Sequence, residues 1–262
     1  MERAVKSSTS RAILLSALAV VVCGCDSNTS SGSTDGVTLN APWNTKVAYG
    51  SLLDTRDSQV YRTVKIGNQT WMAQNLNFAR DSSVCYNGDT LYCSPKGYGY
   101  GRLYQWISAM NIWITYSTQV WGNTGAPEGV CPNNWHLPAS AEWDTLIKNV
   151  GGISNARDAL LSTQGWRGAS YNSNGSDLFG FRMLPAGQKV NDPAYGSLYG
   201  SFQRQEYEAD FWTSNEFDAT TAYYWNFIGQ VSIDGKDSVS HFLPSHSNKL
   251  KTYEFSVRCV LN

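Results

Sequence analysis

Cysteines offer the most specific covalent chemistry in this sequence of 262 residues. Two of the six lie in an N-terminal segment, and Cys85, Cys93, Cys131 and Cys259 lie in the body of the chain. An even number favours disulfides outside the cytoplasm. Of the three possible pairings we favour Cys85 with Cys93 and Cys131 with Cys259, because the first pair brackets a turn-rich Asn-Gly-Asp segment. In the chain-entropy model the second bond stabilises the fold by about 5 kcal/mol.

The histidines show no spacing typical of catalysis or metal binding. His136 has no nucleophile or second ligand at a telling distance along the chain, so we expect a structural, hydrogen-bonded histidine. We expect His241 and His246 to be surface loop residues rather than metal ligands. Cys131 and Cys259 are better used as a disulfide than as a redox or copper-binding pair. The sequence therefore predicts no catalytic residue, no metal site and no cofactor.

Calcium is the one cation that the sequence leaves open. A calcium-dependent lectin site needs clustered carboxylates and amides, and the nearest candidates are Asn215, Glu216 and Asn226. The Glu-Pro-Asn and Trp-Asn-Asp signatures of such lectins are absent. Asp54 and Asp57 are interpreted as turn residues, with a cation site as the alternative.

Aromatic side chains are abundant, with 10 Trp and 15 Tyr residues. Flat rings with polar edges suit both an irregular core and a sugar-binding face. Six tryptophans at apolar-face or motif positions are predicted to be core: Trp71, Trp106, Trp135, Trp143, Trp212 and Trp225. Two loop clusters are candidate ligand surfaces, with burial as the alternative. The first contains Trp166, Tyr171, Tyr195, Tyr199 and Phe202, and the second contains Trp113, Tyr116 and Trp121.

The N-terminus has the order of a secretory signal. Three basic residues precede an apolar run at 12–22, which is too short to span a bilayer, and Cys23-Gly24-Cys25 follows. A small residue directly before a cysteine resembles the bacterial lipobox. We therefore predict a signal peptide at residues 1–24 and a lipidated Cys25, with an ordinary signal peptide cut nearby as the alternative. Acyl chains would anchor the protein to a membrane without spanning it.

A polar stretch follows the predicted lipidation site. Residues 26–36 read DSNTSSGSTDG and contain nothing apolar to bury, so we assign residues 25–36 to the lipidated cysteine and a flexible tether. Residues 37–262 are then predicted to form a single domain. Loss of residues 1–24 removes three basic groups and one acidic group, which moves the net charge from −1 to about −3. This charge argues against a nucleic-acid partner.

Local patterns predict the elements that position these side chains. Apolar and polar residues alternate from Val60 to Ile66, and Gly67-Asn68 then separates them from residues 69–72, which is typical of a β-hairpin. Apolar spacings of i, i+3, i+4 and i+7 predict helices at residues 101–111 and from Trp143 to a stop at Gly151-Gly152. A short third helix is expected at 153–161.

The second half is predicted to be mostly strands and loops. Residues 162–202 are rich in Gly, Ser, Asn and Tyr, broken by a strand-like 179–184, and further strands are expected at 211–214, 223–227 and 254–260. A hairpin, two to three helices, long loops and small antiparallel sheets indicate an α+β fold.

Several blocks resemble the Fibrobacter succinogenes major paralogous domain, and the similarity covers nearly all of the mature chain. They are residues 54–57 with 61–76, Gly101-Arg102-Leu103-Tyr104-Gln105-Trp106, Cys131-Pro132-Asn133-Asn134-Trp135-His136-Leu137-Pro138 with Glu142-Trp143, Phe211-Trp212-Thr213-Ser214 and Ser256-Val257-Arg258-Cys259-Val260. The resemblance implies a bacterial surface or secreted lipoprotein of poorly defined biochemical role.

The layout is also similar to the wider C-type-lectin-like and formylglycine-generating-enzyme fold, in which both ends of the domain meet in one small sheet. That resemblance implies a C-type-lectin-like fold and fits a Cys131 to Cys259 disulfide. One departure is visible, because Ala139 stands where relatives place Ser or Thr. The capping box with Glu142 is then lost, at about 1 kcal/mol, unless Ser140 caps one residue later.

These features favour a noncatalytic, envelope-anchored protein, at the outer membrane or cell surface, that binds glycan or another surface macromolecule through loop aromatics and amides. A structural or assembly protein of the envelope, whose partners are proteins, is the main alternative. A modifying enzyme on the formylglycine-generating fold is the third, and it would require free thiols at Cys131 and Cys259.

Overall fold

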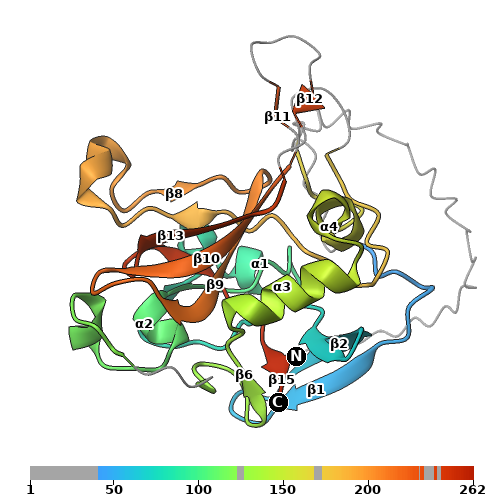
Figure 1. Cartoon of the computed structure of the whole chain (residues 1–262), viewed down its shortest axis with the longest axis horizontal. Helices are drawn as coiled ribbons and strands as arrows, with labels where there is room; N and C mark the ends of the chain where they lie inside the picture. Colours follow the sequence, from blue (N-terminus) through green and yellow to red (C-terminus); the bar gives the residue numbers. More distant parts are fainter. Residues whose placement is uncertain (1–40, 123–126, 168–172, 230, 233–238, 241–242) are drawn as a thin grey trace, which may run out of the picture. The chain divides into compact units, whose positions relative to one another are not determined.

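The computed structural model describes residues 41–122, 127–167, 173–229, 231–232, 239–240 and 243–262 (Figure 1). All of them belong to one compact unit, Asp35–Asn262. The fold is α+β, as predicted, with mostly antiparallel sheets and few helices. In the part of the chain just defined, no helix is both long enough and apolar enough to cross a membrane.

The first sheet brings strands from the beginning of the described chain together with a strand from its end. Its strand order is β1-β2-β3-β15-β6. The strands are β1 Gly50–Asp54, β2 Gln59–Ile66, β3 Gln69–Met72, β15 Val260–Leu261 and β6 Trp135–His136. The predicted hairpin is confirmed, because Ile66 pairs with Gln69 across the Gly67-Asn68 turn.

The second sheet is larger and runs β13-β10-β9-β14-β5-β4, with β7 and β8 attached to β14. Its strands are β13 Ser245–Leu250, β10 Thr221–Ile228, β9 Glu208–Glu216, β14 Glu254–Ser256, β5 Leu103–Gln105, β4 Ser83–Val84, β7 Gln188–Lys189 and β8 Phe202–Gln203. A separate pair, β11 Val231–Ser232 and β12 Val239–Ser240, stands apart (Figure 1). The predicted strands at 211–214 and 223–227 lie within β9 and β10.

Short helices complete the fold. They are α1 Thr90–Cys93, α2 Trp106–Ala109, α3 Ser140–Asn149 and α4 Ile153–Leu160, with 3₁₀ turns at Tyr86–Gly88, Ile114–Ser117 and Pro193–Leu198. The helices predicted from Trp143 and at 153–161 are confirmed. On α3, the Trp143 ring lies 5.0 Å from Trp71 of the first sheet and 5.2 Å from Phe211 of the second. Trp143 therefore packs the two sheets onto one core, and all six tryptophans predicted to be core are buried.

The helix predicted at 101–111 is wrong in its first half. Leu103 and Tyr104 form β5, pairing with Ser256 and Phe255 of β14, and only Trp106–Ala109 is helical. Pairing with a distant strand overrides the local helical period. The strand expected at 179–184 is also wrong, because only Met183 makes a bridge, to Leu161, and Arg182 has a left-handed φ of 52°.

The strand expected at 254–260 is divided between the two sheets. β14 ends at Ser256 in the second sheet, and β15 begins at Val260 in the first. The intervening residues 257–259 carry the chain from one sheet to the other. This crossing is where Cys259 lies, and it bonds to Cys131 with an S–S distance of 2.00 Å.

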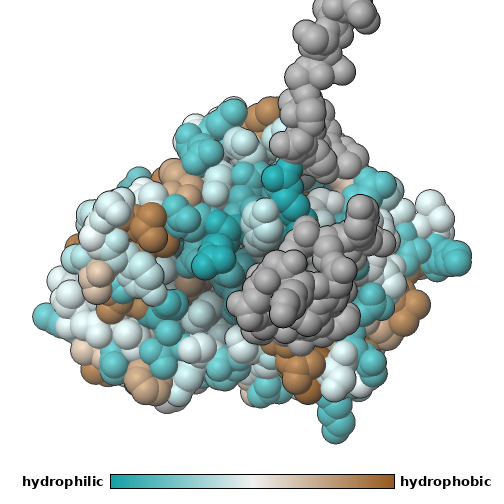
Figure 2. Space-filling model, turned by 90° about the horizontal axis from the view of Figure 1, so that it is seen from above, coloured by the Kyte–Doolittle hydropathy of each residue, from teal (hydrophilic) through white to brown (hydrophobic). Residues whose placement is uncertain are grey.

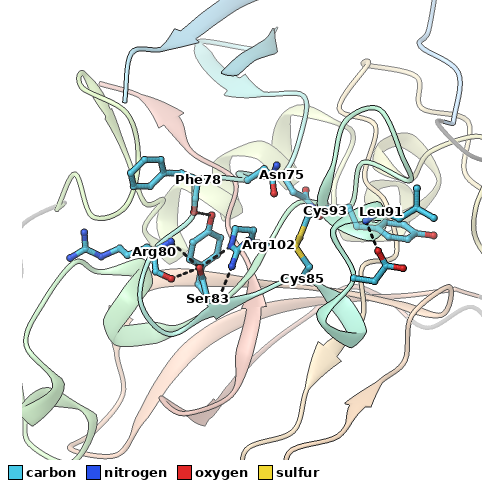
Figure 3. The surroundings of a disulfide bond; sticks show 12 residues. Asn75, Phe78, Arg80, Ser83, Cys85, Leu91, Cys93 and Arg102 are labelled. Carbon is cyan, nitrogen blue, oxygen red and sulfur yellow. Dashed lines mark hydrogen bonds between the residues drawn. A yellow bond between two sulfur atoms is a disulfide. The ribbon is translucent and has the colours of Figure 1, made fainter. Parts of the chain in front are cut away.

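Both favoured disulfide pairings are confirmed. Figure 3 shows the Cys85–Cys93 bond, which closes the short loop between the Tyr86–Gly88 turn and α1. Beside it, Arg102 donates to Ser83 Oγ at 2.9 Å and to the Ser83 carbonyl oxygen at 2.8 Å, which joins the edge strand β4 to the residue that precedes β5 (Figure 3).

Two contacts replace the missing side-chain cap at the N-terminus of α3, one from within the helix and one from β9. Ala139, and not Ser140, is the N-cap residue, and it has no side-chain acceptor. Glu142 Oε2 accepts from the Ala139 N–H at 2.9 Å, and Asn215 Oδ1 from β9 accepts from the Ser140 N–H at 2.7 Å. His136 is hydrogen-bonded as predicted, with its ring nitrogens held by Glu142 and Asn262. Although burial opposes it, the Glu142 carboxylate raises the pKa of His136.

Candidate functional site

A cavity of about 310 Å³ lies between β9, β10 and β13 and the segment that holds β7 and β8. In Figure 1 the orange segment with β8 lies above β13, β10 and β9. Polar side chains and tyrosines line most of it: Glu208, Asp210, Asn226, Arg204, Lys249, Tyr195, Tyr224 and Tyr253. We call it the Asp210 cavity.

Strand alternation explains why these side chains converge. Residues two apart on a strand point to the same face, which places Glu208 with Asp210 on β9 and Tyr224 with Asn226 on β10. Asn226 stands directly opposite Asp210 in the antiparallel register, and its Nδ2 donates to Asp210 Oδ1 at 2.6 Å. Lys249 enters from β13, opposite Ala222. Three neighbouring strands therefore contribute to one polar floor.

Of the two acidic residues that line the cavity, Asp210 is the more deeply buried. Its side chain is 1% exposed, and Oδ2 has no hydrogen-bond partner among the described residues. Burial, followed by the neighbouring Glu208, raises the pKa of Asp210 to about 8. Leaving a buried polar oxygen unpaired costs about 1–3 kcal/mol, so this atom is a candidate to bind a ligand group.

Opposite charges surround the carboxyl pair. Burial raises the pKa of Glu208, against the opposing effect of Arg204 and Lys249. Arg204 Nε lies 3.7 Å from Glu208 Oε1. The cavity thus offers donors and acceptors side by side, an arrangement that suits hydroxyl groups because each hydroxyl both donates and accepts.

An aromatic wall faces this floor. Tyr195 is 46% exposed and sits on the 3₁₀ turn Pro193–Leu198, which Asp192 caps by accepting from the Ala194 N–H at 2.9 Å. Lys249 Nζ lies 5.7 Å from the centre of the Tyr195 ring and 5.2 Å from that of Tyr253. These contacts hold the Tyr195 ring beside the cavity.

Only part of the first predicted aromatic cluster lies at this cavity. Tyr195 lines it, whereas Tyr199 is 58% exposed and does not, and Phe202 packs 5.0 Å from Tyr86 beside a neighbouring cavity. The exposure expected of Trp166 is wrong, because its ring is buried in the core and its Nε1 donates to Ser162 Oγ and to the Met183 carbonyl oxygen. Tyr171 lies outside the described residues.

The second predicted cluster lies elsewhere. Trp113 is 80% exposed, while Tyr116 and Trp121 are half-buried against the core. None of the three lines the Asp210 cavity. The structure therefore separates the two clusters.

The residues considered as calcium ligands do not lie together in the structure either. Asn226 belongs to the cavity, whereas Asn215 contacts α3 and Glu216 accepts from Lys251 Nζ and from the Trp121 N–H. Asp54 is buried at the end of β1, where it accepts from the Arg56 backbone N–H of the following turn and pairs with the Arg56 side chain at 2.7 Å. Within the described ranges, no group of three or more His, Cys, Asp or Glu side chains is placed to hold a metal ion.

His246 is exposed, as expected, but it lies on β13 and not in a loop. Its Nε2 is 2.9 Å from Ser140 Oγ, and its ring stacks on Tyr223 and Trp225 with centres 4.7 and 5.4 Å away. These contacts join β13 to α3 and β10. His241 lies outside the described residues.

Glu208, Asp210, Lys249 and Arg204 were not among the predicted site residues. The sequence holds one weak indication of this site, because two acidic residues, two positions apart, interrupt an otherwise apolar strand at Glu208-Ala209-Asp210-Phe211-Trp212. These residues form a site only because the strand register sets Asn226 opposite Asp210. Local sequence patterns do not specify that register.

Comparison with known proteins agrees with the motifs. The family model of the Fibrobacter succinogenes major domain matches residues 64–261. No curated protein and no solved structure matched the chain. The matched range includes the Asp210 cavity, α3, both disulfides and all strands but β1 and the start of β2. The chain therefore belongs to the Fibrobacter succinogenes major domain family.

Proposed function

We propose that this protein is a noncatalytic, envelope-anchored binding module that holds a glycan in the Asp210 cavity. The observation that carries the proposal is that Asp210 lines the cavity and has a buried, unpaired Oδ2. A sugar hydroxyl can accept from this carboxyl when it is protonated and donate to it when it is ionised. Asn226, Lys249 and Arg204 supply further polar contacts.

The size and walls of the cavity support a sugar. Its volume of about 310 Å³ is at the low end of ligand cavities, roughly 300–1,000 Å³, which suits a small unit of a longer glycan. The Tyr195 ring offers a face on which a sugar ring stacks. On the face seen in Figure 2, hydrophilic side chains predominate and hydrophobic ones are scattered. That face offers hydrogen bonds rather than a continuous apolar surface.

The same proposal includes a C-type-lectin-like fold and a lipid anchor at Cys25. Two disulfides support an oxidising, extracytoplasmic location. The alternative of a modifying enzyme with free thiols at Cys131 and Cys259 loses its support, because these two cysteines are joined. A structural or assembly protein of the envelope is the competing class, and the binding test below separates it from a glycan-binding protein.

Replacing Tyr195 with Ala is expected to weaken binding to the glycan that the wild-type protein selects on an array of plant and bacterial polysaccharides. Loss of ring stacking and of the tyrosine hydroxyl should cost about 1.5 kcal/mol, or roughly tenfold in affinity. Tyr199→Ala is the matched control, since this exposed neighbour does not line the cavity and should bind as wild type. Equal loss in both variants would place binding on the loop aromatics instead of the cavity. A wild-type array without signal would favour the assembly protein.

Replacing Cys25 with Ser is expected to move the protein from the membrane fraction to the soluble fraction after cell lysis. Buried acyl chains contribute about 0.8 kcal/mol per methylene, so their loss removes the anchor. Cys23→Ser is the control and should remain with membranes. Metabolic labelling with a fatty-acid analogue that marks Cys25→Ser as strongly as wild type would contradict the lipidation.

A further inference from the structure

A second cavity, of about 400 Å³, is lined by arginines and, as far as the described residues go, by no acidic side chain. It lies at the start of the described chain and is lined by Trp43, Arg62, Gln74 and Arg182, with Pro42 and Pro95 at its sides. None of its lining residues belongs to the Asp210 cavity. We call it the Arg182 cavity.

Arg182 is buried with unused hydrogen-bond donors. Its side chain is 2% exposed, and its Nε donates to the Ala41 carbonyl oxygen at 2.8 Å. Within the described chain, the two terminal nitrogens have no hydrogen-bond partner, although the residue lines the cavity. A guanidinium carries five N–H donors, so most of the donors of this buried group are unsatisfied.

A second guanidinium contacts the same aromatic ring as the first. The Arg62 guanidinium carbon lies 4.3 Å from the centre of the Trp43 ring, and the Arg182 guanidinium carbon lies 4.4 Å from it. Arg62 is exposed, and its side chain likewise makes no hydrogen bond to the described residues. Cation–π contacts thus keep two like charges at one cavity despite their repulsion.

The charge behind the cavity is not balanced. Arg258 is fully buried, and its donors are taken by Asn75 Oδ1 and the Phe181 carbonyl oxygen. Among the described residues, the one acidic side chain close to this cluster is Asp177, whose Oδ1 accepts from the Arg182 backbone N–H at 2.6 Å. Three guanidinium groups therefore face one carboxylate, in a chain whose net charge is −1. Buried charge of one sign calls for a counter-ion.

We infer that the Arg182 cavity binds an oxyanion group, a carboxylate or a phosphate, with Arg182 and Arg62 of its lining as donors. Guanidinium groups bind both anions through paired N–H donors. The Gln74 side-chain amide can add a third donor, because its Oε1 already accepts from the Arg62 backbone N–H at 2.7 Å and its Nε2 remains for the ligand. This inference is independent of glycan binding at Asp210.

The test is calorimetric titration of the purified full chain with inorganic phosphate and, separately, with glucuronate. One of the two is expected to bind at a single site, and the one that binds identifies the source of the oxyanion. Arg62→Gln should weaken that binding about tenfold or more, since a hydrogen bond to a charged group contributes about 1.5–3 kcal/mol. Arg62→Lys keeps the charge but lacks the paired N–H donors of a guanidinium, so it should give an intermediate loss of affinity.

Lys65→Gln is the matched control, because Lys65 is exposed on the same strand and its loss changes the net charge equally. It should bind as wild type. Arg62→Gln should melt as wild type without ligand, which separates lost binding from lost folding. Absence of binding by both anions, unchanged binding in Arg62→Gln, or equal weakening by Lys65→Gln would overturn the inference.

Discussion

Replacing Asp210 with Asn is expected to raise the melting temperature at pH 8 while weakening glycan binding. The folded protein holds Asp210 with a pKa of about 8, against an ordinary value of 3.8. Between these values the folded chain keeps a proton that the unfolded chain has lost. Stability from this group is therefore complete below about pH 4 and is lost as the pH rises to about 8.

The Asp210→Asn variant does not lose stability in this way, because its side-chain amide is never ionised. Each pH unit inside the window changes the free energy of unfolding by up to about 1.4 kcal/mol. Charges on Glu208, Arg204 and Lys249, with the Tyr224 hydroxyl, surround the carboxyl and limit the total. We expect a gain of about 2 kcal/mol at pH 8, roughly 4–8 °C in melting temperature, and little gain at pH 4.

The same substitution should weaken glycan binding while it raises stability. Above pH 8 the ionised Asp210 accepts from a sugar hydroxyl, whereas Asn can only present an N–H at that position if its oxygen stays with Asn226. Binding by Asp210→Asn should therefore fall about tenfold at pH 8.5 and less at pH 6, where the protonated carboxyl also donates. Asp144→Asn, on the exposed face of α3, is the control for both measurements. A variant that is less stable at pH 8, or that binds as wild type at pH 8.5, would contradict this role.

A stabilising substitution that removes binding distinguishes a ligand site from ordinary structure. Buried polar groups that serve only the fold normally have partners, and their removal destabilises. Asp210 pairs one oxygen with Asn226, and its other oxygen is buried without a partner among the described residues. Such local instability persists where it serves a function.

Local sequence patterns were sufficient for elements whose contacts are local. The hairpin at 59–72 depends on a two-residue turn, and α3 and α4 depend on a 3.6-residue period ended by Gly151-Gly152. The segment at 103–105 has the same period but pairs with β14, about 150 residues later in the chain. Periodicity alone does not contain that pairing, so the helix was predicted too long.

The same distinction applies to the sites. Tyr195 was a candidate because an aromatic residue in a polar loop is unusual in itself. Asp210 and Arg182 stand in apolar stretches of the sequence, and they become informative only through partners far along the chain, such as Asn226 across the sheet and Trp43 near the N-terminal end. Trp166 shows the reverse error. Its sequence is typical of a loop, which made it a candidate for an exposed ring, but the ring is buried in the core.

Replacing both Cys131 and Cys259 with Ser is expected to cost far more stability than replacing Cys85 and Cys93. The first bond joins residues 128 apart and the second joins residues 8 apart, so the chain-entropy model gives about 5 and about 2.5 kcal/mol. The larger figure is comparable with the whole stability of many domains, about 5–15 kcal/mol. Urea unfolding of the two double variants measures the difference.

Position adds to the effect of loop length. Cys259 lies where the chain passes from β14 to β15, so its bond fixes the crossing that places one C-terminal segment in two sheets. Without it, β15 is held beside β3 and β6 by only a few residue pairs. We therefore expect the Cys131→Ser, Cys259→Ser variant to lose the first sheet and to accumulate poorly, whereas the Cys85→Ser, Cys93→Ser variant folds with a lower urea midpoint. Equal midpoints for the two variants would show that the sheets hold each other without the covalent link.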